Sequence, residues 1–168
     1  MTLTLILTRH AKSDWGTPGQ PDFDRPLNGR GRRSAKALGQ WLAERGLRPA
    51  EAVPSGARRT VETWECMALA FDPAPPVRDD MRLYDAPAER MLEVLRDAEA
   101  SPLLLIGHNP GIGEFASRLA IAPPAHPRFV DYPTGATAIF RFARDGWRDV
   151  GWREGEVVDF ITVRQLTD

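Results

Sequence analysis

Short apolar runs that pass straight into helix-starting residues constrain the fold of this chain most strongly. Residues Leu103 to Ile106 form an uninterrupted apolar run of strand length, which is typical of a strand buried on both faces of a parallel sheet. The run leads into Gly107-His108-Asn109-Pro110, where Asn109 can cap a helix and Pro110 can fill its first position. A buried strand followed at once by a helix predicts an α/β fold.

The same alternation of strand and helix runs through most of the chain. Periodicity predicts strands over residues 2–8, 51–54, 103–106 and 136–142, and helices over 29–45, after Ser55, over 87–98 and after Asn109. Two further strands are expected over 147–152 and 157–163, paired in antiparallel fashion. Residues 11–28 carry too many Gly and Pro for a regular element and predict a long surface loop. We therefore expect a three-layer α/β/α domain with a mostly parallel central sheet.

Length and charge limit the class of protein. A chain of 168 residues has the length of one domain, so we expect a single domain over residues 1–168, acting as a monomer. Its 22 basic and 23 acidic residues nearly cancel, which argues against nucleic acid or a membrane surface as a partner. No apolar run could span a bilayer, and Met1-Thr2-Leu3 lacks the basic start of a signal peptide. With a single cysteine, Cys66, these features predict a cytoplasmic protein.

Polar residues follow three of the predicted strands at the point where each strand ends. They are Arg9-His10, the segment from Ser55 to Arg59, and His108-Asn109. Because ligands of α/β folds lie beyond the carboxyl ends of the strands, we expect these residues to meet at one edge of the sheet. Arginine is not a metal ligand and no carboxylate is held beside the histidines by sequence, so we expect neither a metal nor a cofactor.

Two arginines and two histidines at such an edge suit a phosphoryl group. Guanidinium groups match phosphate oxygens bidentately, and the start of the helix after Asn109 adds N–H groups that favour an anion. A neutral imidazole can attack phosphorus and hold the group as phosphohistidine. The arginines would then stabilise the charge that moves onto the equatorial oxygens.

Several segments carry a resemblance to a known family. They read Arg-His-Ala-Lys-Ser at 9–13, Ser-Gly-Ala-Arg-Arg-Thr-Val-Glu-Thr at 55–63 and Gly-His-Asn-Pro-Gly at 107–111, with Asp-Arg-Pro-Leu-Asn at 24–28, Gly31 and Pro-Thr-Gly-Ala at 133–136. In this order they resemble the motifs of the histidine phosphatase superfamily, in the branch that includes phosphoglycerate mutases and SixA-type phosphohistidine phosphatases. The resemblance runs from Thr4 to about Phe142 and implies a phosphoglycerate mutase-like fold.

The resemblance also implies roles for individual residues. His10 would be the nucleophile, Arg9 and Arg59 would bind the phosphate, and His108 would donate to the phosphoryl oxygens with Asn109 beside it. Arg59 lies four residues after the serine and four before the threonine of the second motif, so its neighbour Arg58 is the weaker match.

The general acid stays open at this point. Asp85 lies just before Pro87, at about the place where mutase-like members carry their acid, but an aspartate there is also an ordinary helix cap. Asp14, Asp22 and Asp24, in the loop after His10, are weaker candidates.

The resemblance favours one substrate class without excluding others. The chain is short and has little length for the helical insertions that close over substrate in mutases, and an open site suits a bulky phosphodonor. Asn109 stands where the acid-phosphatase branch has an aspartate, and Ala11 and Gly16 depart from the mutase-like pattern. We therefore expect a phosphatase acting on protein phosphohistidine, in signal transduction. The alternatives are a small-molecule phosphomonoesterase and a phosphate-dependent binding module.

Three other features allow more than one interpretation. The basic stretch from Arg25 to Arg33 is either a solvated loop and helix start or a rim that attracts an acidic partner. Trp15 either lines the mouth of the site or packs the loop. His126, between prolines, is expected to be exposed and without a role.

Overall fold

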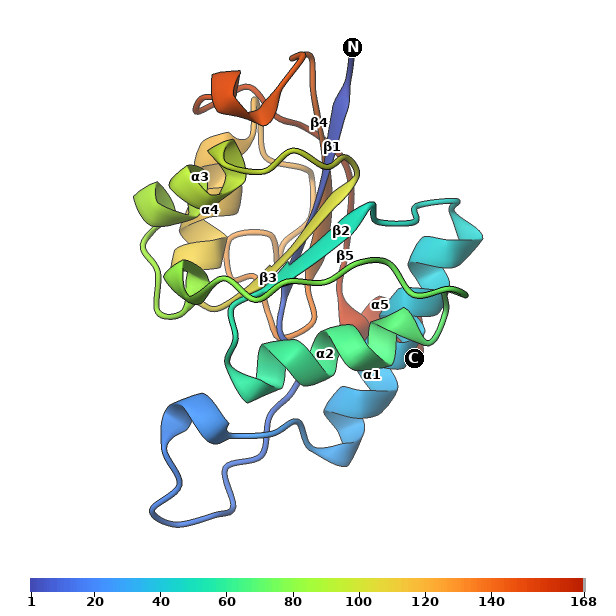
Figure 1. Cartoon of the computed structure of the whole chain (residues 1–168), viewed down its shortest axis with the longest axis vertical. Coiled ribbons are helices and arrows are strands. Elements are labelled where there is room, and N and C mark those ends of the chain that lie inside the picture. The colour runs from blue at the N-terminus through green and yellow to red at the C-terminus, as the bar shows by residue number, and fades with distance from the viewer. Residues whose placement is uncertain (168) are drawn as a thin grey trace.

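The computed structural model describes residues 1–167 and is built around one five-stranded sheet in the order β2-β3-β1-β4-β5 (Figure 1). The strands are β1 (Leu3–Arg9), β2 (Glu51–Pro54), β3 (Leu103–Gly107), β4 (Thr137–Phe142) and β5 (Glu156–Ile161). β1, β2 and β3 are mutually parallel, β4 is antiparallel to β1, and β5 is antiparallel to β4. Every strand except β4 therefore runs in the same direction, which confirms the mostly parallel sheet.

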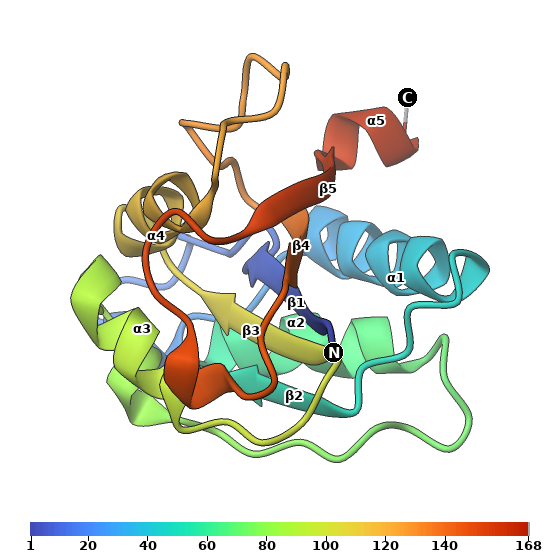
Figure 2. The same cartoon turned by 90° about the horizontal axis from the view of Figure 1, so that it is seen from above.

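Helices cover both faces of the sheet, as the three-layer prediction requires. They are α1 (Gly29–Glu44), α2 (Arg58–Ala68), α3 (Ala88–Arg96), α4 (Gly111–Leu119) and α5 (Val163–Thr167). Figure 2 shows α3 and α4 on one side of the strands, with α1 and α5 on the other. α2 packs along α1 in that second layer.

The side chains of β3 explain why this strand is apolar throughout. Leu103 and Leu105 join the hydrophobic core beneath α3 and α4, whereas Leu104 and Ile106 join the core beneath α1 and α2. All four are fully buried. Successive side chains of a strand point to opposite faces, so only a strand covered on both sides needs an unbroken apolar run.

The structure differs from the sequence prediction towards the C-terminus. Residues 147–152 are not a strand: Trp147–Asp149 is a short 3-10 helix. Trp147 is buried, and its Nε1 donates to the backbone oxygen of Ala100 at 2.7 Å. The last strand ends at Ile161 and a short helix follows it. In both places a tertiary contact or a turn overrides the local β-propensity.

The predicted loop over residues 11–28 is irregular but folded. It contains the 3-10 helix η1 (Asp22–Asp24), and an isolated bridge joins Ser13 to Leu27. Asn28 ends the loop and caps α1, because its side-chain oxygen accepts from the backbone N–H of Gly31 at 2.8 Å. Within residues 1–167, no helix has the length and apolarity needed to cross a membrane.

Candidate active site

The carboxyl ends of three neighbouring strands bring the predicted residues together. His10 follows β1, Arg59 begins α2 after β2, and His108 follows β3. The rings of His10 and His108 lie 5.3 Å apart, and Arg59 Nη2 lies 3.2 Å from His108 Nδ1. These three side chains are at most 7% exposed. The expectation that they meet at one edge of the sheet is therefore correct.

Backbone hydrogen bonds hold His10 where β1 ends. Its N–H donates to the backbone oxygen of Gly107 at 3.2 Å, and the Gly135 N–H donates to the carbonyls of both Arg9 and His10. Gly135 has a φ of 77°, a conformation in which a side chain would be strained. A glycine at this turn lets the segment before β4 close against the carboxyl end of β1.

The protonation of the His10 ring follows from its neighbours. His10 Nδ1 lies 2.7 Å from the backbone oxygen of Ala11. A carbonyl oxygen can only accept, so Nδ1 carries the hydrogen and Nε2 of the neutral ring has a free lone pair. Burial, followed by the positive charges around it, lowers the pKa of His10 to about 3. The ring is thus neutral near pH 7, with Nε2 in the state that a nucleophile needs.

A chain of hydroxyl groups sets the protonation of His108 in the same way. Thr60 Oγ1 donates to the backbone oxygen of Ala57 at 2.7 Å, so the hydroxyl of Ser55, 3.1 Å away, donates to Thr60. Ser55 Oγ then accepts from His108 Nε2–H at 2.7 Å. His108 Nδ1 is left as the acceptor for Arg59 Nη2.

This arrangement bears on the expected role of His108. Burial, and then the charge of Arg59, lowers the pKa of His108 to about 4. In the structure the neutral ring has no hydrogen on Nδ1, so it accepts from Arg59. Donation from Nδ1 to a phosphoryl oxygen requires a second proton on this ring. A bound dianion would supply the electrostatic reason to take it up.

Two arginine donors are left without acceptors. Arg9 Nη1 donates to the backbone oxygen of Tyr132 at 3.2 Å. The Nε atoms of Arg9 and Arg59 are buried and have no hydrogen-bond partner within residues 1–167. A buried donor without a partner costs about 1–3 kcal/mol. A bound ligand with several acceptor oxygens would provide partners for these two Nε–H groups.

Asp22 contacts the site through Arg59, although sequence reasoning ranked it low. Its Oδ2 accepts from Arg59 Nη2 at 3.0 Å and from the Tyr84 hydroxyl at 2.6 Å, and its Oδ1 accepts from Arg25 at 3.1 Å. The hydrogen bond from Tyr84 is the main cause that lowers the pKa of Asp22 to about 2. The carboxyl is therefore ionised near neutral pH and has no proton to give as a general acid.

The other three candidate acids, Asp14, Asp24 and Asp85, have different surroundings. Asp14 accepts from the backbone N–H of Gly16 and shapes its own turn, and the exposed Asp24 side chain has no hydrogen-bond or ionic partner within residues 1–167. Asp85 is exposed, with a φ of 52°, and directly follows Tyr84, whose ring lies 5.4 Å from that of His108. The N-cap of α3 is Pro87 without a side-chain hydrogen bond, so the cap interpretation of Asp85 is wrong.

Asn109 ties α4 to a neighbouring segment. Its Nδ2 donates to the backbone oxygens of Asp131 and Tyr132, at 2.8 and 3.1 Å, and its Oδ1 accepts from the N–H of Gly113. The helix begins at Gly111 with Pro110 as N-cap, one residue later than predicted. The side chain of Asn109 is therefore engaged in structure, and only backbone N–H groups of this turn remain for an anion.

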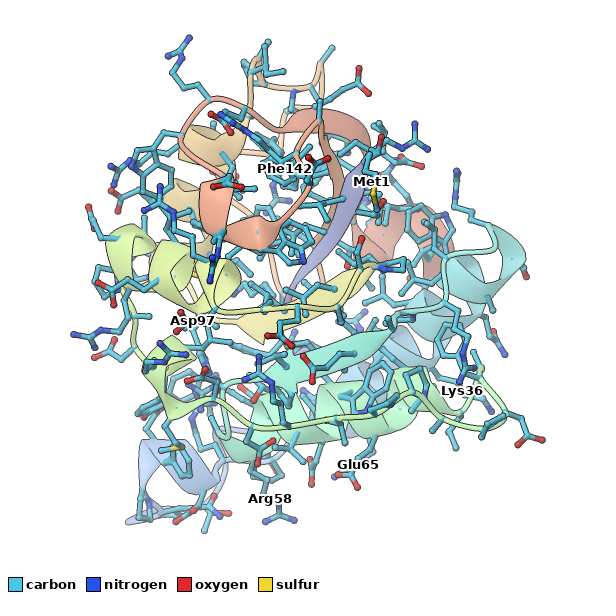
Figure 3. All side chains as sticks on the ribbon, turned by 45° about the horizontal axis from the view of Figure 1, so that its top comes forward. Met1, Lys36, Arg58, Glu65, Asp97 and Phe142 are labelled. Atoms are coloured by element: carbon cyan, nitrogen blue, oxygen red, sulfur yellow. The ribbon has the colours of Figure 1, made fainter. Side chains whose placement is uncertain are left out.

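The neighbours Arg58 and Arg59 have opposite environments. Arg58 extends from α2 away from the sheet (Figure 3), where its Nε donates to Glu62 at 3.0 Å. Arg59 points inward, and both Nη atoms are held by Asp22, one through its carboxylate and the other through its backbone oxygen. The structure thus brings only Arg59 to the histidines.

The arginines of the basic stretch differ in their environments, and Arg25 is not solvated as the loop interpretation expected. Arg25 is 8% exposed, contacts Ser13 and Asp22, and has its guanidinium 3.5 Å from the centre of the Trp15 ring. Trp15 therefore packs against the loop while remaining 77% exposed. The later arginines of the stretch are exposed: Arg30, Arg32 and Arg33.

Sequence reasoning assigned no role to three residues that contact the site: Ser55, Tyr84 and Arg25. Ser55 and Arg25 stood in recognised motifs, and their roles could have been found by asking what each side chain binds. Tyr84 had no such signal, because its contact with Asp22 joins segments that are 62 residues apart.

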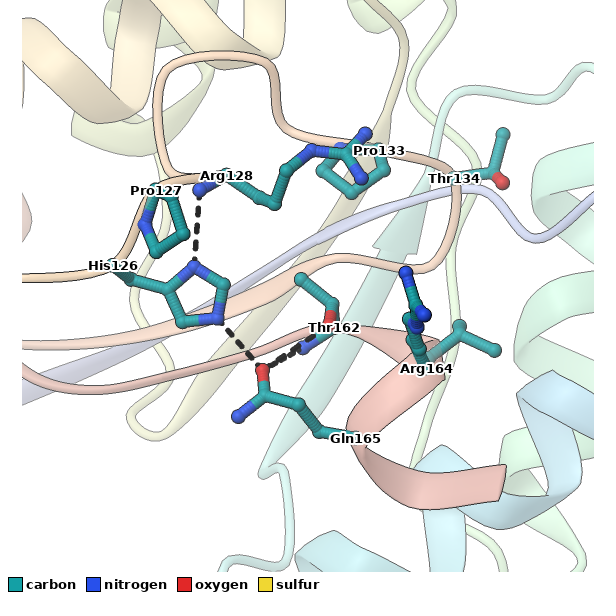
Figure 4. Close-up of a pocket in the computed structure, with 9 residues that line it drawn as sticks. His126, Pro127, Arg128, Pro133, Thr134, Thr162, Arg164 and Gln165 are labelled. Atoms are coloured by element: carbon teal, nitrogen blue, oxygen red, sulfur yellow. Dashed lines mark hydrogen bonds between the residues drawn. The ribbon is translucent and has the colours of Figure 1, made fainter. Parts of the chain in front are cut away.

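A hollow of about 720 Å³ lies elsewhere, between the segment before β4 and α5 (Figure 4). His126 forms part of its wall: Nε2–H donates to Gln165 Oε1 at 2.8 Å, and Nδ1 accepts from the Arg128 N–H. The expectation that His126 has no role is wrong, because it joins this segment to α5. None of the predicted site residues lines the hollow.

The described residues also bear on metal binding. Among residues 1–167, no three His, Cys, Asp or Glu side chains gather in a way that could hold a metal ion. The grouped side chains at the strand ends are instead cationic arginines and neutral imidazoles. This donor set suits an oxyanion.

A neutral histidine flanked by inward-pointing arginines, at the carboxyl ends of a mostly parallel sheet, is typical of enzymes that transfer phosphoryl groups through histidine. The chain belongs to the histidine phosphatase superfamily (branch 1), whose sequence model matches residues 5–86. A protein of Mycobacterium tuberculosis is 33% identical over 150 residues, which cover 84% of this chain and 90% of that protein. A chloroplast protein of Arabidopsis thaliana is 31% identical over 127 residues, 69% of this chain, and the chain spans 58% of its length.

Solved structures agree with this assignment. A Nakamurella multipartitia protein, provisionally assigned as the phosphohistidine phosphatase SixA, has a TM-score of 0.82 and 27% identity, with 96% of each chain covered. A protein with the same provisional assignment from Agrobacterium tumefaciens has a TM-score of 0.76 and 26% identity over 95% of this chain and 97% of that one. A mycobacterial glucosyl-3-phosphoglycerate phosphatase shares the fold, at a TM-score of 0.66 and 20% identity over 94% and 99% of the chains. Superfamily and SixA-like neighbours together support phosphatase activity.

Proposed function

We propose that this protein is a phosphohistidine phosphatase that hydrolyses its substrate through a phosphohistidine intermediate on His10. The observation that carries the proposal is the hydrogen bond from His10 Nδ1–H to the Ala11 carbonyl at 2.7 Å. It leaves Nε2 unprotonated within a buried group of arginine side chains.

In the first step, His10 Nε2 attacks the phosphorus atom. A new P–N bond forms while the bond to the leaving group breaks, and Arg9 and Arg59 donate to the equatorial oxygens as charge develops. His108 takes up a proton on Nδ1 when the dianion binds and then donates to a phosphoryl oxygen. Water cleaves the phosphohistidine in the second step and releases inorganic phosphate. No step calls for a metal, so activity should survive a chelator.

Protein phosphohistidine is the substrate class that we favour. The rim of the site is exposed, with Trp15 77% and the Asp22 side chain 50% accessible, so a donor attached to a protein surface could approach. The imidazole of such a donor leaves readily once it is protonated, which suits a site where the carboxylate in contact with Arg59 is ionised. A small-molecule phosphomonoesterase is the alternative, and Asp85 is the proposed acid for ester substrates.

The test is to trap the intermediate and compare substrates. A protein phosphorylated on histidine and a set of small phosphate esters are assayed side by side, with rapid alkaline quenching to preserve phosphohistidine. We expect phosphate on His10 during turnover and loss of nearly all turnover in His10→Ala. If the enzyme is active but no phosphate is found on His10, the mechanism is rejected. Faster turnover of the esters would reject the substrate class and leave the mechanism standing.

A further inference from the structure

Charged side chains of both signs lie around the two histidines. Arg59, Asp22, Arg9 and Arg25 are among the charged side chains whose fields act on His108. Three positive charges and one negative charge leave two positive charges in this group. A phosphoryl group carries about −1.5 to −2 near neutral pH. The negative charge of Asp22, paired with Arg59 and Arg25, therefore lowers the positive charge that the site offers to an anionic substrate.

Asp22 is an integral part of this group. Its carboxylate accepts four hydrogen bonds, from Arg59, Tyr84 and twice from Arg25. Two carboxylate oxygens offer about four acceptor positions, so Asp22 is saturated. It is also bound to the guanidinium that we place on the substrate phosphate, so its charge lies within one side chain of the phosphoryl position.

We propose that Asp22 is a specificity-determining residue that restricts the site to donors with no second anionic group near the phosphate. Without the Asp22 charge, the positive charge of Arg59 and Arg25 would be uncompensated and would favour phosphate esters that also carry a carboxylate. With it, a phosphoryl group on a neutral or cationic donor, such as an imidazole, matches the site. The inference rests on the proposed function, since it assumes that phosphate binds at Arg9 and Arg59.

A matched pair of ligands isolates this effect. Glycerol 3-phosphate and 3-phosphoglycerate present the same phosphate ester, and only the second carries a carboxylate. Their affinities are measured by calorimetry on the full chain in the His10→Ala background, so that neither is turned over. Orthophosphate serves as a third ligand that reports the phosphate site alone.

The variants are Asp22→Asn and, as a control, Asp24→Asn. Asp24 lies in the same 3-10 helix, and within residues 1–167 its side chain has no hydrogen-bond or ionic partner. A charge within about 4–6 Å commonly shifts an ionisation by 1–3 pKa units, which corresponds to at least about tenfold in affinity. We expect Asp22→Asn to favour 3-phosphoglycerate over glycerol 3-phosphate by about tenfold more than the parent, and Asp24→Asn to leave this ratio unchanged.

Each other outcome contradicts the proposal. If Asp22→Asn weakens both esters equally, Asp22 only positions Arg59. If Asp24→Asn shifts the ratio as much, the effect is one of general surface charge. In both cases the proposed function stays intact as long as the parent binds orthophosphate. If the parent binds no phosphate ligand, the proposed function and this inference fail together.

Discussion

At the scale of single residues, the neighbours Arg58 and Arg59 allow a direct test of which arginine stabilises the transition state. Arg59 is 6% exposed and contacts His108 and Asp22, whereas Arg58 is paired with Glu62 at the surface. Loss of one positioned donor to a transition state commonly costs about 100–1000-fold in rate, and an exposed ion pair contributes about 0–1 kcal/mol. We predict that Arg59→Ala lowers kcat about 100–1000-fold and that Arg58→Ala changes it less than about threefold. Steady-state kinetics, with a melting curve for each variant, decides this; equal losses would contradict it.

Ser55 is the residue on which the protonation of His108 depends. Replacing it by alanine removes the acceptor for His108 Nε2–H in a fully buried position. A lost partner of this kind costs about 1–3 kcal/mol, or about 5–150-fold in an equilibrium. We predict that Ser55→Ala lowers kcat by about tenfold or more and moves the acid limb of its pH profile.

Thr60→Ser is the matched control for Ser55→Ala. The variant retains the hydroxyl that accepts from Ser55 and donates to Ala57. It should therefore keep the parent pH profile. A pH profile that is unchanged in Ser55→Ala would show that the hydroxyl only fills space.

At the scale of elements, the positions of the histidines could be predicted because they depend on local pattern. β3 is recognisable from its unbroken apolar run, and α4 from Ile112, Phe115 and Leu119 on one buried face. Parallel strands have their carboxyl ends at one edge, so two recognised strands were enough to place His10 near His108. This part of the site follows from element order alone.

The remaining part of the site could not be predicted because it depends on how the loop over 11–28 folds. Asp22 reaches Arg59 and Tyr84, which lie 37 and 62 residues away in the sequence. No periodicity encodes such a contact. The wrong strand at 147–152 has a similar cause, since the buried indole of Trp147 and its bond to Ala100 fix a 3-10 turn there.

Asp85 lies between the 3-10 helix η2 (Met81–Leu83) and α3, and its role as acid stays a prediction. An alkoxide needs a proton as it leaves, and a general acid contributes typically about 10²–10⁴-fold. The imidazole of phosphohistidine can be protonated from solvent beforehand. We predict that Asp85→Asn depresses hydrolysis of alkyl phosphates by about 100-fold and that of phosphohistidine far less. Parallel kinetics on both substrates tests this, and small equal losses would remove Asp85 from the mechanism.

At the scale of the whole molecule, the buried histidines make folding stability depend on pH. The pKa of His10 is lowered to about 3 and that of His108 to about 4, from an ordinary value of 6.5. Between these values and 6.5 the unfolded chain binds more protons than the folded one. Stability is therefore complete above about pH 6.5 and declines as the pH falls, by at most about 1.4 kcal/mol per pH unit for each histidine. Asp22, with a pKa of about 2 against 3.8, adds a loss of the same sign only below about pH 4.

We predict that the free energy of unfolding, measured by urea titration at several pH values, falls steadily from about pH 6.5 to about pH 4. The double variant His10→Asn, His108→Asn should lose most of this slope, because it no longer has two imidazoles that are kept neutral by burial. His126→Asn is the control: its side chain is less buried and lies beside Gln165, outside the site, so the parent slope should persist. An equal slope in the double variant and the parent would mean that carboxylates, and not His10 and His108, set the acid limit of this fold.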